Sequence, residues 1–318
     1  MWLSLRERHG AGAKRCARMA LAVAGVCTAV ALGLLAMEHH VLARRQAGPS
    51  EFRLRLSARP EWMPRSLARA LVARLTPADS GPRDPNLTRK VYHAAKADPW
   101  VRRVTRVVRR PSDDPNVAIV ELQAEFRKPI ACIQTPNGPR FLDADGIHLP
   151  TDQVPRWAAR FRHADGTVRQ VCFVSDRDVP PGARARPIHY IKISGVKAGP
   201  PEFGHTWPGE DLAAGIRLAA LVAGRPYANQ IAVADVRNYA GRMLKQGEPH
   251  LRYFAQVGRG NTTEIRFGRF PEPGGDHNVR TERKLSYIDA YVGRHNGRLA
   301  GLHSYIDLRF DELHVSVY

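Results

Sequence analysis

Cysteine is scarce in this sequence, which contains four cysteines among 318 residues. No CxxC pair and no Cys/His cluster has the spacing of a zinc site, so the common structural zinc modules are excluded. Cys16 and Cys27 lie near the N-terminus, whereas Cys132 and Cys172 lie further along the chain. For Cys132 and Cys172 two alternatives stay open: one disulfide in an oxidising compartment, or two separate buried thiols.

Motifs of the common enzyme classes are also missing. The sequence has no nucleophile elbow, no HExxH, no phosphate-binding loop and no Rossmann or kinase glycine pattern. Gly258 and Gly260 fit a turn between strands, and the adjacent His39 and His40 have no further ligand at metal-site spacing. We therefore predict no catalytic residues, no metal and no cofactor.

Acidic residues are fewer than basic ones: the sequence has 30 Asp and Glu and 49 Lys and Arg, which gives a formal net charge of +19. Such a charge suits nucleic acid, anionic lipid headgroups or another polyanion. The arginines are spread along the whole chain, which favours a generally basic surface over a dedicated nucleic-acid site. Hydrophobic residues make up 43% of the chain, as in globular proteins, and the length predicts about two folded units.

Charge is absent from residues 19–37, "MALAVAGVCTAVALGLLAM". As a helix this stretch would span about 28 Å, enough to cross a bilayer. No convincing small-x-small site follows it, which favours an uncleaved anchor over a cleaved signal peptide. The basic residues among 1–18 predict a cytoplasmic tail, followed by the membrane helix, a linker at 38–50 and an extracytoplasmic remainder. This location argues against a nucleic-acid partner and leaves anionic lipid or cell-wall polymer as contacts.

Two amphipathic helices are predicted shortly after the linker. Residues 51–56 alternate apolar and charged side chains, as a half-buried strand does. Pro64 then opens a helix, and Asp84 with Pro85 opens a second one. The apolar stripes of the two helices are Leu67, Leu71 and Leu75, and Leu87, Val91 and Ala95.

Two further strands are predicted at residues 98–111, "DPWVRRVTRVVRRP", and at residues 117–126, "VAIVELQAEF". The order over 51–128 is strand, helix, helix, strand, strand, a compact α+β unit with both helices on one face of a small sheet. The arginines of the first of these strands divide between its two faces, which dilutes a basic patch and favours an exposed structural strand. Its predicted partner-binding surface consists of Trp100, Arg102, Arg103 and Arg106.

Short motifs follow one another in a characteristic order. Pro99, Trp100 and Val101 open the second strand, "PIA" follows the third at 129–131, and "DADG" forms a turn at 143–146. Behind them come "YIKISGV" at 190–196, "NTTEIRFGR" at 261–269 and "YIDLRF" at 305–310. In this order and behind a predicted anchor, these motifs resemble the bacterial cell-division protein family FtsQ/DivIB.

The resemblance implies a POTRA domain over 51–128 and a β-rich domain with a few helices over 129–318. Two helices are predicted in the second domain, at 207–224 and 282–292. Their predicted buried residues are Leu212, Ile216, Ala219 and Ala223, and Leu285, Ile288 and Val292. The sequence departs from the family pattern at "FRKP", 126–129, and in an extra Pro- and Arg-rich region at 151–189.

The C-terminus, "YIDLRFDELHVSVY", alternates apolar and polar residues. Ile306, Leu308 and Phe310 share one face in this pattern. An edge strand at 313–318 leaves a backbone edge that accepts a partner's strand, unless the chain itself covers this edge. The resemblance implies the first alternative, because members of the family hold small membrane-anchored division proteins by strand addition. The predicted binding residues are Leu313, His314, Val315, Ser316, Val317 and Tyr318.

These features together predict a non-enzymatic scaffold of septum assembly in the cell inner membrane. Its predicted partners are the lipid bilayer, through the N-terminal helix, and other membrane-anchored division proteins. One alternative is a POTRA-bearing protein of secretion or envelope assembly. Another is a membrane-anchored protein that binds or acts on cell-wall polymer through its basic surface.

Overall fold

The computed structural model describes residues 21, 23–38, 49–163, 165–256, 261–270 and 279–316. Within these residues the fold is mixed α and β and consists mostly of β-sheets. The chain divides into two compact units. The smaller unit comprises 1–53, 79–87 and 109–120, and the larger comprises 54–78, 88–108 and 121–318. The boundary at 128/129 that the sequence suggested stays a prediction.

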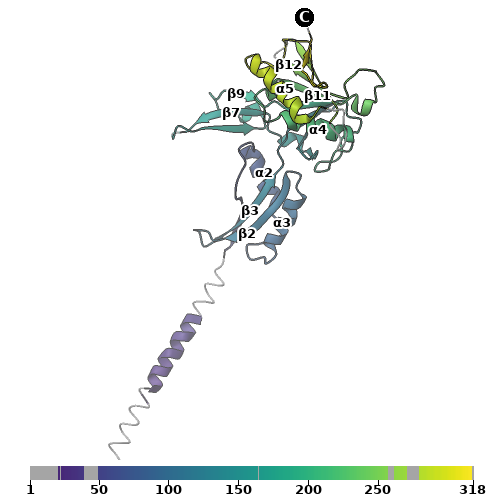
Figure 1. Cartoon of the computed structure of the whole chain (residues 1–318). Coiled ribbons are helices and arrows are strands. Elements are labelled where there is room, and N and C mark those ends of the chain that lie inside the picture. Colours follow the sequence, from purple (N-terminus) through teal and green to yellow (C-terminus); the bar gives the residue numbers. More distant parts are fainter. Residues whose placement is uncertain are drawn as a thin grey trace, which may run out of the picture. The chain divides into compact units, whose positions relative to one another are not determined.

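The order of elements over residues 51–126 is the predicted one (Figure 1). The three strands form one sheet in the order β1-β3-β2. Each apolar stripe of the helices is buried, since all six predicted residues are at most 2% exposed. The elements are β1 (Glu51–Leu56), α2 (Arg65–Leu75), α3 (Leu87–Ala97), β2 (Val101–Arg110) and β3 (Val117–Phe126).

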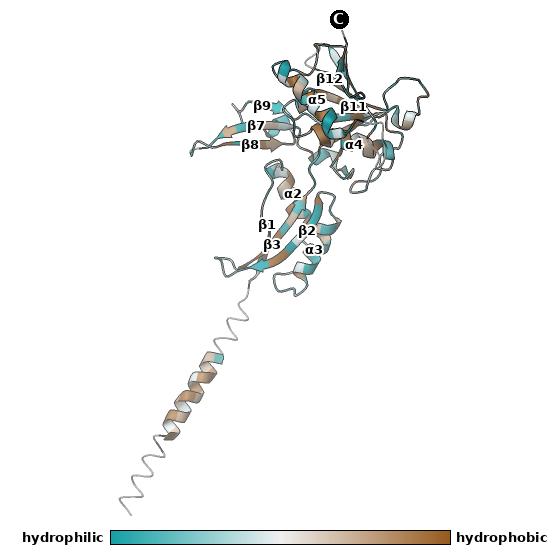
Figure 2. Ribbon diagram, viewed as in Figure 1, coloured by the Kyte–Doolittle hydropathy of each residue, from teal (hydrophilic) through white to brown (hydrophobic). Residues whose placement is uncertain are grey.

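The predicted membrane-spanning helix at 19–37 is wrong. Residues 21 and 23–38 are helical and largely apolar (Figure 2). Among the residues described, no helix is long and apolar enough to cross a membrane. Met19, Ala20 and Ala22 lie outside the described residues.

A nine-stranded sheet dominates the larger unit, in the order β15-β14-β13-β12-β11-β10-β4-β5-β6. β10 pairs in parallel with both β4 and β11, and β13 pairs in parallel with β14. Each of the pairs β10/β11 and β13/β14 is connected through one α-helix, α4 or α5. The elements are β4 (Ala131–Thr135), β5 (Gly138–Leu142), β6 (His148–Leu149), β10 (Ile191–Ser194), α4 (Glu210–Val222), β11 (Ile231–Asp235), β12 (Leu251–Gln256), β13 (Thr262–Gly268), α5 (Thr281–Arg294), β14 (Tyr305–Asp307) and β15 (His314–Val315).

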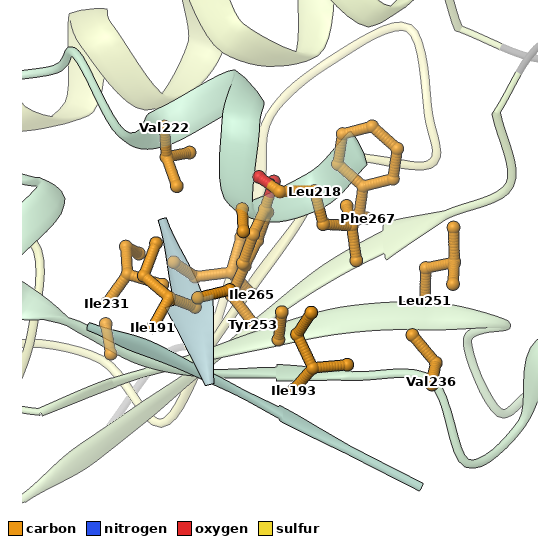
Figure 3. Close-up of a cluster of buried hydrophobic side chains, with 14 of the residues drawn as sticks. Ile191, Ile193, Leu218, Val222, Ile231, Val236, Leu251, Tyr253, Ile265 and Phe267 are labelled. Atoms are coloured by element: carbon orange, nitrogen blue, oxygen red, sulfur yellow. The ribbon is translucent and has the colours of Figure 1, made fainter. Parts of the chain in front are cut away.

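The main core lies between one face of this sheet and the helices α4 and α5. Strand alternation places Ile193, Tyr253 and Ile265 on that face, where Figure 3 shows them below Leu218 and Val222 of α4. The Tyr253 hydroxyl donates a 2.9 Å hydrogen bond to the Leu218 carbonyl. On β12 and β13 the opposite face carries charged residues, among them Arg252, Glu264 and Arg266.

The predicted helix residues are buried with one exception. Leu212, Ile216 and Ala219 are at most 6% exposed, but Ala223 is exposed and Val222 takes the buried position. Ala223 is the C-cap of α4, which ends at Val222, and its N–H still donates to the Ala219 carbonyl. In α5 the predicted residues Leu285, Ile288 and Val292 are all buried.

The Pro- and Arg-rich region at 151–189 forms a sheet of its own, in the order β8-β7-β9. Its strands are β7 (Trp157–Arg162), β8 (Val168–Phe173) and β9 (Ala185–Pro187). Four short 3-10 turns complete the described elements: Thr151–Gln153, Asp176–Asp178, Ala228–Gln230 and Tyr239–Gly241.

Candidate partner-binding edge

The C-terminal segment forms the outermost strand of the nine-stranded sheet. β15 pairs only with β14 among the described strands, with Val315 opposite Ile306 and His314 opposite Asp307. Leu313 and Val315 pack against the core and are half-buried. The structure therefore places four of the six predicted residues, 313–316, at a sheet edge. Val317 and Tyr318 lie outside the described residues.

Ser316 fixes the end of this strand. Its hydroxyl accepts hydrogen bonds from the backbone N–H groups of Ser304 (2.9 Å) and Tyr305 (3.3 Å), and its own N–H donates to the Tyr305 carbonyl. The ring of His303 contacts the Ser316 carbonyl at 3.0 Å. These bonds hold the inner side of β15 on β14, and its outer side pairs with no strand in the described part of the chain.

Phe310 is exposed rather than buried, so the predicted common face with Ile306 and Leu308 is wrong. Ile306 and Leu308 are fully buried, but β14 ends at Asp307 and the alternation ends with it. Phe310 is 50% exposed and contacts the ring of His314, with 5.0 Å between the ring centroids. An aromatic side chain thus contacts β15, the outermost of the described strands.

Arg309 turns the chain at the end of β14. Its backbone N–H donates to Asp307 Oδ1 (3.1 Å), and its guanidinium binds both carboxylate oxygens of Asp307. The Leu308 N–H still donates to the Arg266 carbonyl of β13, at 3.0 Å. Gly268 has φ +81°, and a Cβ there would lie 2.8 Å from Arg309 Cγ. The absence of a side chain at Gly268 therefore leaves room for the side chain of Arg309 at the end of β14.

A network of alternating charges extends from this edge over the open face of the sheet. Arg266 lies beside Glu264 and 3.8 Å from Asp307, and Arg252 joins Glu264 to Asp235. Asp235 is 1% exposed. Burial alone would raise the pKa of Asp235, but hydrogen bonds from Arg237 and Arg252 outweigh it and hold this pKa below its ordinary value. Asp235 is thus an ionised carboxylate that its arginines stabilise.

No model of a known protein family matches this chain, and no curated protein matches its sequence. The resemblance to the FtsQ/DivIB family therefore rests on the short motifs of the sequence and their order. One of these motifs has a defined structure, the turn at 143–146. The carboxylate of Asp143 accepts hydrogen bonds from the backbone N–H groups of Asp145 and Ile147. It also forms an ion pair with Arg127, with 2.6 Å between Arg127 Nη1 and Asp143 Oδ2.

Trp100 is wrongly predicted as a surface residue. Its side chain is fully buried, its Nε1 donates to Gln153 Oε1 (3.1 Å), and its ring lies beside that of Trp62. Tertiary contacts of this kind bury an aromatic side chain that directly precedes a partly exposed strand. Trp100 therefore belongs to the core and not to a partner-binding surface.

The three predicted surface arginines on β2 are exposed. Arg102 pairs with Asp145 at 2.8 Å, and Arg103 pairs with Glu125 of β3. The second pair joins the neighbouring strands β2 and β3. Arg106 forms no ion pair with any described residue, and of the three it is the one with an unneutralised charge.

Cys132 and Cys172 are free thiols in the structure, and both are buried. They belong to β4 and β8, strands of two different sheets. Burial raises the pKa of Cys132 to about 11 and also raises the pKa of Cys172, so both thiols are protonated at neutral pH. This arrangement corresponds to the alternative of two separate buried thiols.

No group of His, Cys, Asp and Glu residues that could hold a metal ion occurs in the described part of the chain. His39, His40, Gly258 and Gly260 lie outside it.

Sequence reasoning missed the pairs Asp235/Arg237 and Asp307/Arg309. The signal was present, because "DVR" at 235–237 and "DLR" at 307–309 each follow a short apolar run.

Proposed function

We propose that this protein is a non-enzymatic scaffold of bacterial cell division that holds partner division proteins by strand addition at β15. The observation that carries the proposal is the position of β15 at the edge of the nine-stranded sheet. A strand at a sheet edge presents backbone N–H and C=O groups that an extended segment of another protein can pair with. Phe310 beside this edge offers an apolar contact to the same partner.

The proposed location is the cell envelope at the division septum, with the described domains outside the inner membrane. This part of the proposal comes from the motif resemblance and does not depend on a spanning helix. A fluorescent fusion at midcell during constriction is the expected result. A uniform envelope signal would instead favour the alternative role in secretion or envelope assembly.

The partner-binding edge is tested by deletion of residues 313–318. We expect the shortened protein to lose small membrane-anchored division proteins that co-purify with the full chain. Circular dichroism of the shortened protein establishes that the rest of the sheet remains folded. Unchanged recovery of these partners would contradict the proposed edge.

A milder pair of variants separates the edge from general surface hydrophobicity. Phe310 and Phe203 are 50% and 44% exposed, and each contacts one histidine ring. Phe310→Ala is expected to reduce partner recovery several-fold, whereas Phe203→Ala leaves it unchanged. Equal losses in the two variants would argue against the edge at β15.

A further inference from the structure

The small sheet β8-β7-β9 carries an unusual excess of arginine. Residues 151–189 contain seven arginines, no lysine and four aspartates. Three of the aspartates serve turns: Asp165 accepts hydrogen bonds from the backbone N–H and hydroxyl of Thr167, and Asp176 and Asp178 cap a 3-10 turn at Ser175. The acidic side chains are thus bound locally at the ends of the strands.

All seven arginines are exposed, and none forms an ion pair with any residue in the described part of the chain. They are Arg156, Arg160, Arg162, Arg169, Arg177, Arg184 and Arg186. This sheet therefore differs from β2, where Arg102 and Arg103 are paired with carboxylates. Because a guanidinium presents its N–H donors in a planar fork, an all-arginine surface suits carboxylate groups bound in two-point geometry.

The register of the sheet gathers three arginines on one face. Arg160 lies opposite Gln170 of β8, Arg162 opposite Val168, and Arg186 of β9 opposite Ala158. Side chains two residues apart on a strand are separated by roughly 7 Å, and neighbouring strands by about 4.8 Å. Arg169 of β8 lies opposite Phe161 and points to the other face. A strand added to β8 would meet positive charge on both of its faces.

The two edges of this sheet are not equivalent. β9 has three residues, and its last one, Pro187, has no N–H to donate. β8 has six residues without proline and pairs with β7 alone. The hairpin bond from His163 N–H to the Thr167 carbonyl sets the alternation, so that the N–H groups of Val168, Gln170 and Cys172 point away from β7. Val168 and Gln170 are exposed, whereas Cys172 is buried. A further strand can therefore pair with β8 along its exposed part, residues 168–170.

The remaining features favour a peptide over lipid or nucleic acid as the occupant of this edge. Val168 is the one large apolar residue of the sheet that is strongly exposed, which is little for insertion into a membrane. Trp157, Phe161 and Phe173 are half-buried, so they present no free aromatic faces on which bases stack. The unpaired N–H and C=O groups of a strand edge can form a ladder of hydrogen bonds with another polypeptide backbone, but not with a lipid or a nucleic acid.

We infer that β8 binds an extended acidic segment of a partner protein, which adds to the sheet as a fourth strand. The backbone of this segment pairs with β8, and its Asp or Glu side chains, at every second position and therefore on one face of the strand, reach Arg160 and Arg162. The site lies in a different sheet from β15 and does not depend on the function proposed for that edge.

The test uses the purified full chain and a labelled ten-residue peptide that alternates Glu with Thr, with fluorescence anisotropy as the readout. Three controls separate the contributions: the same peptide with Gln for Glu, the Glu peptide N-methylated at alternate backbone positions, and inorganic polyphosphate or anionic phosphatidylglycerol vesicles as competitors. We expect the Glu peptide to bind, and the Gln and N-methylated peptides each to bind at least about tenfold more weakly.

Charge reversal in the protein gives an independent measurement. Arg160→Glu with Arg162→Glu, which lie on the same face of β7, is expected to weaken binding of the Glu peptide at least about tenfold. The control is Arg65→Glu with Arg69→Glu, which makes the same charge change on exposed positions of helix α2. Equal weakening in both variants would overturn the proposed site.

Two other outcomes also overturn the inference. Unweakened binding of the N-methylated peptide would mean that charge alone attracts the peptide, without strand addition. Binding of polyphosphate or vesicles with no binding of the Glu peptide would assign the arginines to a phosphate-bearing ligand.

Discussion

Two β-α-β units of the nine-stranded sheet have the same local design, but they lead into very different strands. In the first, β10, α4 and β11 end in Asp235 and Arg237; in the second, β13, α5 and β14 end in Asp307 and Arg309. In each unit the arginine binds both oxygens of the aspartate, and the residue between them donates its N–H to the preceding parallel strand. A glycine with positive φ, Gly195 or Gly268, lies beneath each arginine.

The next strand along the chain is where the two units diverge. β11 is followed by β12, six residues long, whose Arg252 lies opposite Asp235. β14 is followed by β15, which has two residues and places His314 opposite Asp307. The second unit thus has a short strand where the first has a full one. β11 is thus covered along its length by β12, whereas β14 has only the two-residue β15 beside it, which supports strand addition by a partner at β15.

The glycines give the largest expected difference between the units. A Cβ at Gly195 would lie 2.3 Å from Arg237 Cγ and 2.5 Å from its backbone nitrogen, whereas a Cβ at Gly268 meets only the flexible Arg309 side chain. We expect Gly195→Ala to destabilise the protein by about 3 kcal/mol and Gly268→Ala by about 1–2 kcal/mol. Urea unfolding followed by circular dichroism measures both. Equal losses would mean that the two turns are under the same constraint.

The two aspartates give the second-largest expected difference between the units. Asp235 is bound by Arg237, Arg252 and the Ser194 hydroxyl, whereas Asp307 is bound closely by Arg309 alone. We expect Asp235→Ala to cost about 2–3 kcal/mol in unfolding free energy and Asp307→Ala about 1–2 kcal/mol. The lowered pKa of Asp235 adds a pH signature: its contribution is present at neutral pH and is lost as pH falls below about 4 through the folded-state pKa. A difference between wild type and Asp235→Ala that persists unchanged at pH 2 would contradict this assignment.

The buried faces of the two helices differ in one lysine. α5 buries Lys284, whereas the buried face of α4 is apolar apart from Asp211. Burial lowers the pKa of Lys284 to about 8, and its ammonium group donates to the Arg269 carbonyl beside the Phe267 ring. The unfolded chain keeps its proton up to about pH 10.4, so the stability of wild type should rise between pH 8 and 10.

Lys284→Met removes this titration. We expect the variant to be more stable than wild type by about 1 kcal/mol at pH 7, with the gain disappearing by pH 10. Thermal unfolding at both pH values measures the difference. A variant that is less stable at pH 7 would show that the hydrogen bond to Arg269 outweighs the cost of burying the charge.

The smallest expected effect on stability is that of His314→Arg. This substitution places an arginine opposite Asp307, as Arg252 lies opposite Asp235 in the first unit. An arginine opposite Asp307 should raise the unfolding free energy by about 0.5 kcal/mol. The matched control is Glu312→Gln, which changes the formal charge by the same amount at a neighbouring exposed position. An equal gain in the control would assign the effect to net charge rather than to the register of β15.

Local patterns predicted the periodic elements well and the long-range contacts poorly. The strand at 51–56 and the stripe Leu67, Leu71, Leu75 depend on side chains a few positions apart, and both are where the pattern put them. Trp100 is buried by Trp62 and Gln153, and no periodicity reports contacts so distant in sequence. The position of Val315 in an edge strand was predictable from the alternation of apolar and polar residues. The pairing of Asp307 with Arg309 at the end of β14 was not predictable, because it depends on β13, the parallel neighbour of β14.

The open face of the large sheet has a kinetic consequence. Four carboxylates, Asp235, Glu248, Glu264 and Asp307, alternate there with four guanidinium groups, Arg237, Arg252, Arg266 and Arg309. Their fields cancel beyond a Debye length of about 8 Å, so a partner approaching β15 gains little electrostatic steering. The arginines around β8 are not cancelled in this way. Association at β15 should therefore be nearly independent of ionic strength, whereas association at β8 slows steeply as salt is added.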